Sequence, residues 1–110
     1  MASGIKGTQK PSGGTPTLSS AAIVTATATT TMILSCCNQA AAAETLKIAI
    51  VPASESGTGA IPLQYYIEFD FSLAANTAME RTGITLESGA KVIVGSASGN
   101  ISFVAYGLDS

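Results

Sequence analysis

The residues of this chain that could carry chemistry are seven carboxylates, two cysteines and many hydroxyls, and there is no histidine. Glu68 and Asp70 lie two residues apart, so on a strand they share a face and form the best candidate for a catalytic or calcium-binding pair. Acid–base catalysis needs a group that titrates near neutral pH, or two carboxyls with separated pKa values. Carboxylates on the polar side of a strand are usually just solvated, and calcium takes six or more oxygens. The pair therefore does not predict an enzyme.

The cysteines and hydroxyls do not predict a reactive centre either. Cys36 and Cys37 are adjacent, and in an extended chain neighbouring side chains point to opposite faces, which disfavours a disulfide between them. Two cysteines without histidine do not make a zinc site, and no histidine or well-placed lysine activates a hydroxyl. We expect no enzymatic activity, no metal and no cofactor.

A signal for lipid attachment is the other reading of these cysteines. Residues Ile33–Cys36 fit the cleavage site of a bacterial lipoprotein. The preceding segment, Ala21–Ser35, is rich in threonine, which makes a weak hydrophobic region for a signal peptide. A lipoprotein anchored at Cys36 remains an alternative, although no segment has the roughly 20 uninterrupted apolar residues that span a bilayer.

Composition favours a protein that contacts other proteins. The chain has 110 residues, the size of one domain, with a net charge of −2. Its five basic residues do not cluster as nucleic-acid binding requires. Apolar residues make up 46% of the chain and charged residues only 11%, so a monomer would leave apolar surface exposed. Such surface usually marks contact sites.

The segment Gln64–Ser72 gives the clearest structural signal, because large apolar residues alternate with polar ones. The apolar set is Tyr65, Ile67, Phe69 and Phe71, and the opposite set is Gln64, Tyr66, Glu68 and Asp70. A period of two predicts a strand with one face against a second layer.

Further strands follow at intervals near ten residues. They are expected at Leu18–Thr25, Thr29–Cys37, Thr45–Val51, Arg81–Leu86, Lys91–Gly95 and Asn100–Gly107. Helices at residues 38–46 and 73–79 are alternatives, since Asn38 could cap an alanine-rich helix. Seven to eight strands predict an all-β fold, a single antiparallel β-sandwich of the jelly-roll type.

The first 17 residues are rich in Gly, Ser, Thr, Pro and Lys and predict an extended arm ahead of a sandwich domain at residues 18–110. The arm is expected to be held by a neighbouring protein. The alternative is that it folds back along its own domain.

Several segments resemble small structural proteins of the virions of tailed bacteriophages, notably cyanophages. The likeness runs from Ile23 to Gly107 and rests on Cys37-Asn38, Leu46-Lys-Ile-Ala-Ile50, Tyr66-Ile-Glu-Phe-Asp70, Leu73-Ala-Ala-Asn76, Glu80-Arg-Thr-Gly-Ile84, Leu86, Ser88-Gly89 and Val104-Ala-Tyr-Gly107. It implies a β-sandwich that is part of the particle and has no catalytic residues, either as capsid decoration (cement) or in the tail or fibres. Residues 1–20 have no counterpart in this likeness.

We therefore expect a non-enzymatic virion protein, most simply a capsid decoration protein. Its expected partners are other copies of itself, with a trimer as one arrangement, and the major capsid or tail proteins, but no nucleic acid and no membrane. A tail or fibre protein that binds a receptor or glycan is the alternative. The loop Ala53–Ala60 is a candidate contact, and the candidate contact residues are Ile5, Lys6, Lys10, Leu18, Tyr66, Arg81 and Tyr106.

Overall fold

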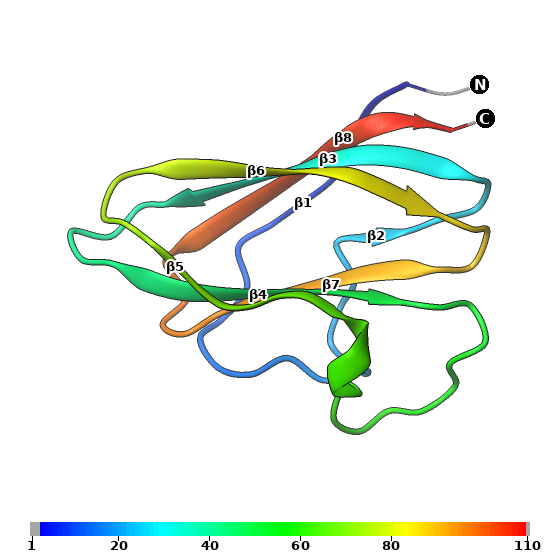
Figure 1. Ribbon diagram of the computed structural model, residues 1–110, viewed down its shortest axis with the longest axis horizontal. Coiled ribbons are helices and arrows are strands. Elements are labelled where there is room, and N and C mark those ends of the chain that lie inside the picture. The colour runs from blue at the N-terminus through cyan, green and yellow to red at the C-terminus, as the bar shows by residue number, and fades with distance from the viewer. Residues whose placement is uncertain (1–2, 110) are drawn as a thin grey trace.

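A computed structural model describes residues 3–109, which form eight strands and one short 3-10 helix (Figure 1). The elements are β1 (Ser3–Gln9), β2 (Val24–Thr25), β3 (Thr30–Asn38), β4 (Glu44–Val51), η1 (Leu63–Tyr65), β5 (Tyr66–Leu73), β6 (Ala78–Leu86), β7 (Lys91–Ser96) and β8 (Ile101–Asp109). The predicted all-β class is confirmed. Neither alanine-rich helix forms, because residues 39–43 and 74–77 are turns between strands.

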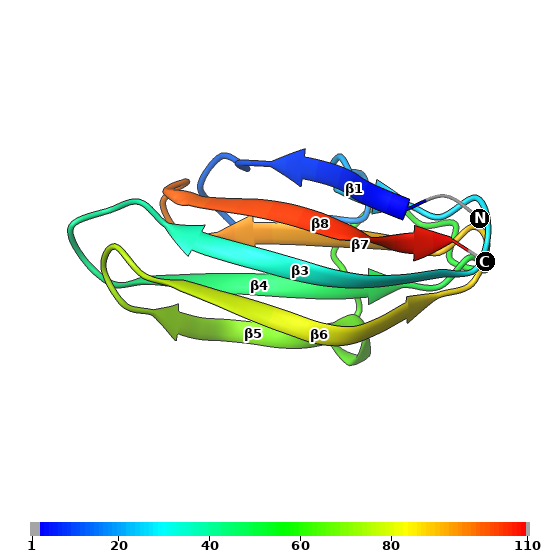
Figure 2. The ribbon, with the colours of Figure 1, turned by 90° about the horizontal axis from the view of Figure 1, so that it is seen from above.

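The strands form two four-stranded sheets, and their pairing is antiparallel throughout. Sheet A has the order β1-β8-β3-β6 and sheet B the order β2-β7-β4-β5. The first half of the chain pairs with the second half in reverse, so that β1 meets β8, β2 meets β7, β3 meets β6 and β4 meets β5. This arrangement is an eight-stranded jelly roll, and Figure 2 shows sheet A lying over sheet B.

The main core lies between the sheets and follows the predicted alternation in the central strands. On β3 the buried side chains are Met32, Leu34 and Cys36, and on β8 they are Ile101, Phe103 and Ala105. Leu46 and Ile48 of β4 face them from sheet B. The predicted ranges for β3, β4, β7 and β8 agree with the structure to within two residues.

A second apolar cluster lies on the outer face of sheet B. It joins Ala49, Val51 and Ile93 of the sheet to Leu18 and Ile61, which come from two long connections. Figure 1 shows both connections, residues 10–23 and 52–65, passing beneath sheet B. The predicted strand Leu18–Thr25 is therefore wrong, because only Val24 and Thr25 form a strand. The preceding residues instead cover sheet B.

The alternation predicted for β5 is also wrong. The pairing of β5 with β4 shifts register at Asp70, whose φ is +56°, and again at Ile67. Each one-residue bulge moves the following side chains to the other face. As a result Phe69 lies opposite Lys47 on the outer face and is 54% exposed. Glu68 lies opposite Ile48, which belongs to the inner face.

The N-terminal segment takes the fold-back arrangement that the sequence left open. Residues Ser3–Gln9 form β1, which pairs along its length with β8 at the edge of sheet A. Gly7 lets β1 lie close to the chain just before β2, because a Cβ atom at residue 7 would lie 2.0 Å from the backbone oxygen of Ile23. The segment is thus a strand of the sandwich, although none of its residues is buried.

Candidate interaction surfaces

The outer face of sheet A carries apolar side chains that no other described segment covers. Residues directly opposite in antiparallel strands share a face, and Ile5, Tyr106 and Ile33 lie opposite one another across β1, β8 and β3. Leu108 lies beside them, opposite Thr31. We call these residues, with Val104, the bare face. Ile5 is 71% and Leu108 42% exposed, and Figure 1 shows none of residues 3–109 above this sheet.

A shallow depression lies at the centre of the bare face. Its volume is about 360 Å³, and its lining residues are Thr31, Met32, Ile33, Tyr106, Gly107 and Leu108. Glycine is required at residue 107, because a Cβ atom there would lie 2.0 Å from the carbonyl oxygen of Thr31 on the neighbouring strand. The depression gives the face a concave, apolar centre.

The charged groups of sheet A already have partners. Lys6 lies 3.0 Å from Asp109, Arg81 lies 2.8 Å from Glu68 of sheet B, and the hydroxyl of Tyr106 donates to Glu80 at 2.6 Å. The hydrogen bond to Glu80 raises the pKa of Tyr106. Glu80 differs from the other three charged groups, because its partner is the neutral Tyr106 hydroxyl and not a cation, so one acidic group borders the bare face.

Three candidate contact residues from the sequence lie on this side of the molecule. Ile5 and Tyr106 belong to the bare face itself. Lys10 lies at its edge, beside Val104, and donates from Nζ to the carbonyl of Gly99 at 2.7 Å. A fourth candidate, Arg81, bonds to Glu68, whereas its sequence neighbour Glu80 bonds to Tyr106.

Other candidates fall elsewhere. Leu18 was expected to anchor the arm to a neighbour, but it is buried in the chain's own cluster on sheet B, which makes that assignment wrong. Tyr66 does lie on an outer face, that of sheet B, where it packs against the same cluster. Residues 53–60 are largely exposed, and Glu55 is held there by hydrogen bonds from the Gly57 N–H and the Tyr65 hydroxyl.

Sequence reasoning missed Ile33, Val104 and Leu108. A signal for them was available, because β3 and β8 carry apolar residues at successive positions, such as Met32-Ile33-Leu34, instead of alternating with polar ones. A strand that is apolar on both faces belongs inside a three-layer arrangement or at an interface. On sheet B the chain's own connections cover the outer face, whereas sheet A has no third layer among the described residues.

An aromatic and charged cluster occupies the outer face of sheet B near β5. The ring of Phe69 contacts Tyr66 edge-on at 5.0 Å between centroids, and the ammonium of Lys47 lies 4.9 Å from the Phe69 centroid. Lys47 also forms an ion pair with Asp70 at 2.5 Å. The pair borders a pocket of about 330 Å³ that Thr15, Thr45 and Ser96 also line. This cluster could hold a small hydroxylated ligand.

The proposed carboxylate pair does not exist as a pair. Asp70 faces Lys47 outside sheet B, whereas Glu68 bonds to Arg81 between the two sheet edges.

The Cys36 thiol is not a reactive centre. Its burial, and to a smaller extent the nearby charge of Glu68, raise the pKa of this thiol to about 12, so it stays protonated and unreactive. Within residues 3–109, no three Asp, Glu or Cys side chains gather as metal ligands would.

Glu44 is a buried carboxylate with a structural explanation. It begins β4, and its oxygens accept from the backbone N–H groups of Ser98 and Asn100 and from the Asn100 side chain, at 3.0 to 3.1 Å. Burial by itself would raise its pKa, but these hydrogen bonds to the ionised form lower it below the usual value. Glu44 thus fixes the turn between β7 and β8.

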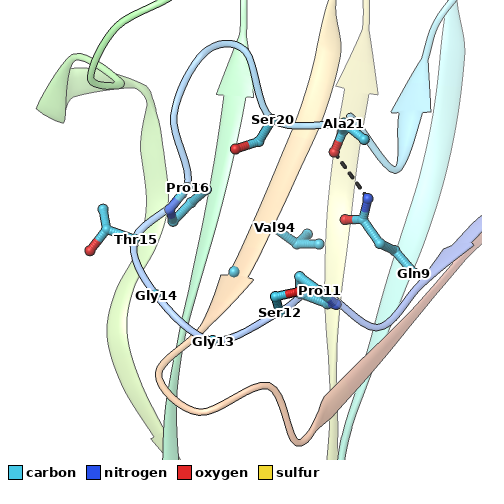
Figure 3. Close-up of a pocket in the computed structure, with 11 residues that line it drawn as sticks. Gln9, Pro11, Ser12, Gly13, Gly14, Thr15, Pro16, Ser20, Ala21 and Val94 are labelled. Atoms are coloured by element: carbon cyan, nitrogen blue, oxygen red, sulfur yellow. Dashed lines mark hydrogen bonds between the residues drawn. The ribbon is translucent and has the colours of Figure 1, made fainter.

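The largest of the described pockets lies under the connection from β1 to β2, and Figure 3 shows this segment arching over β7. Its volume is about 390 Å³, and Gln9, Ser12, Ser20 and Val94 are among its lining residues. The Gln9 amide donates to the carbonyl of Ala21 at 3.0 Å, but its Oε1 is buried with no donor among the described residues. The lining carries no charge or aromatic ring, so it offers only weak, neutral hydrogen bonding.

Comparisons with known proteins do not assign the chain to a family. No family model, no curated protein and no solved structure matches it. Among residues 3–109, no helix has the length and apolarity to span a lipid bilayer. A lipoprotein reading would require cleavage before Cys36, which would remove β1, β2 and most of β3.

Proposed function

We propose that this protein is a non-enzymatic structural subunit of a virion, of the capsid-decoration type, which packs against other copies of itself through the bare face. The observation that carries the proposal is the uncovered apolar row Ile5–Tyr106–Ile33 in a protein that covers its other sheet with its own chain. The jelly-roll order supports it by analogy, because viral coat proteins often use this fold. The resemblance of residues 23–107 to phage virion proteins points the same way.

The outer surface of sheet A, of which the bare face is the apolar part, approaches the size of a specific contact. Sheet A has four strands of up to nine residues, which at about 3.3 Å per residue and about 4.8 Å per strand gives a plane of roughly 30 by 19 Å. Side-chain relief raises the accessible area above that plane of roughly 570 Å². Standard interfaces bury about 800 Å² on each partner, so a contact of that size uses the whole outer surface of sheet A and its rim, with the bare face as its apolar part.

A second copy is the partner that fits this face best. Three of the four charged side chains of sheet A are already in ion pairs, so a charged partner surface would find only Glu80 to pair with and would lose hydration elsewhere. The same face on another copy is apolar and uncharged in its centre, and it can pack by two-fold symmetry in an aligned sheet-on-sheet contact. Repetition of such contacts over many copies would stabilise a particle.

The proposal is tested on purified particles of the virus whose genome encodes the chain. Quantitative mass spectrometry should find the chain in hundreds of copies per particle, as expected for shell decoration. Only a few copies would place it in the tail or a fibre, contrary to the decoration assignment. Its absence from the particles would overturn the virion assignment altogether.

A tail or fibre protein that binds a glycan is the second candidate function. The exposed Phe69 ring, the Lys47–Asp70 pair and the adjoining pocket favour it, because sugars pack on aromatic rings and bond to charged and hydroxyl groups. Phe69→Ser should then abolish binding on a glycan array, whereas Phe71→Ser on the same strand should not. An array without any signal for the wild type would exclude this candidate.

A further inference from the structure

Strand β1 is an edge strand of sheet A that is attached mostly through its backbone. None of its seven residues is buried, whereas β3 and β8 each bury several large side chains. Its attachment consists mainly of backbone pairing with β8, the Lys6–Asp109 ion pair and the Gln9 hydrogen bond to Ala21. β1 therefore contributes no buried side chain of its own, and its contact with the core is the approach of Gly7 to Ile23.

The chain after β1 has a short hinge followed by a firmly attached segment. Lys10, Pro11 and Ser12 separate β1 from Gly13, which forms a bridge to Ser96. From there the segment is held by hydrogen bonds, with Gly14 N–H to Ser96 and Ile23 N–H to Val92 of sheet B, and with Leu18 N–H to Gly59 of the other long connection. Pro11 keeps the hinge extended. The strand can thus move while the cover of sheet B stays in place.

Packing beneath this hinge is loose. The connection spans the pocket of about 390 Å³ seen in Figure 3. The buried Oε1 of Gln9, at the end of β1, has no donor among residues 3–109. β1 therefore gains little from pairing with the β8 of its own chain that it would not also gain from pairing with the β8 of another copy.

We propose that β1 is exchanged between copies, so that the β1 of one molecule completes sheet A of a neighbour by pairing with its β8. Such an exchange recreates every contact of the closed form, including Lys6–Asp109 and the close approach of Gly7 to Ile23. It uses the backbone pairing of β1 with β8, whereas the bare face packs through side chains of sheet A, among them Ile5 of β1, which the exchange returns to the same place. It goes beyond the proposed function, because it assigns the partner of one strand.

A disulfide across the β1–β8 pair tests the exchange. Thr8 and Val104 lie directly opposite each other, so Thr8→Cys with Val104→Cys can form a bridge. Cys37→Ser removes the only native thiol of the described residues that is not buried. The protein is refolded at high concentration from a mixture of unlabelled and ¹⁵N-labelled copies and is then oxidised.

Exchange predicts a covalent dimer on a non-reducing denaturing gel, in which the two peptides that carry the introduced cysteines are joined across the two isotopes. The single variants Thr8→Cys and Val104→Cys should remain monomers and control for accidental cross-linking. A bridge formed only within single chains would overturn the exchange. Sedimentation of Ile33→Asp beside the wild type, both without the introduced cysteines, reports bare-face association separately, because Ile33 lies on β3 and the substitution leaves the β1–β8 pairing unchanged. The two proposals can therefore fail independently.

Discussion

The outer faces of the two sheets start from similar residues but differ in what covers them. On sheet B, Ala49, Val51 and Ile93 are buried by Leu18 and Ile61 from the chain's own connections. On sheet A, Ile33 and Tyr106 are only half-buried, and none of the described residues lies over them. Within residues 3–109, a third layer covers one sheet only. The same apolar pattern on an outer face can therefore stabilise a monomer, where the chain's own connections cover it, or form a contact with another molecule, where they do not.

The largest effect is expected when a charge is placed on each face in turn. Ile93→Asp buries a carboxylate without a partner in the covered cluster, which should cost more than about 4 kcal/mol and prevent folding. Ile33→Asp on the bare face should change the free energy of unfolding by less than about 1 kcal/mol but abolish association through the bare face. Urea unfolding and sedimentation measure the two quantities. Similar destabilisation by both variants would remove the distinction between the faces.

Truncating one apolar side chain on each sheet should give different losses of stability. Leu18→Ala removes a buried contact from the cover of sheet B and should cost about 2–3 kcal/mol. Ile5→Ala, at a position that is 71% exposed, should cost less than about 0.5 kcal/mol. Thermal unfolding under conditions where the protein is monomeric checks both values. A larger loss from Ile5→Ala would mean that the bare face already carries monomer stability.

Acid should weaken both sheets through two different carboxylates. The pKa of Asp109 is lowered by hydrogen bonds from Lys6 and Thr30, and that of Glu44 by the N–H groups that outweigh its burial. A lowered folded-state pKa means that this stability is fully present above the unfolded values, near about 4. It is lost as the pH falls through the folded values.

Substitution separates the two carboxylates. Asp109→Asn should flatten the acid dependence of β1 protection in hydrogen exchange, since Asp109 pairs with Lys6 of β1. Glu44→Gln should instead flatten the acid dependence of global unfolding, because Glu44 fixes the β7–β8 turn. Unchanged acid profiles in both variants would contradict these roles.

The smallest effect is expected at the Glu68–Arg81 ion pair, which links β5 of sheet B to β6 of sheet A. The Arg81 side chain is 40% exposed, and ion pairs in contact with water contribute at most about 1 kcal/mol. A double-mutant cycle with Glu68→Gln and Arg81→Gln should give a coupling within that limit. A coupling several times larger would indicate that this edge, and not the core, holds the sheets together.

The sequence predicted the fold well where burial has a simple period. The alternation around Met32–Cys36 and Ile101–Ala105 reproduces the core, because these central strands have one face against the other sheet. It failed at β5, because a bulge at Asp70 depends on the pairing with β4 and not on local residue types. It failed also at Leu18, whose burial comes from a contact with distant residues.

The interaction surface was predicted only in part. Ile5 and Tyr106 were identified from their position in an arm and on an outer face, and the structure brings them together on the bare face. Their neighbours Ile33 and Leu108 were missed, since only the order β1-β8-β3 places these residues side by side. Which outer face the chain covers depends on where two long connections lie, and no local pattern carries that information.

Sedimentation velocity over a range of concentrations, with wild type compared with Ile33→Asp, measures whether the bare face joins copies. We expect the wild type to form larger assemblies as concentration rises, whereas Ile33→Asp keeps its far-ultraviolet circular dichroism spectrum and grows no further than the dimer that β1 exchange allows. A wild type that remains monomeric throughout, or a folded Ile33→Asp variant that associates equally well, would contradict this role of the bare face.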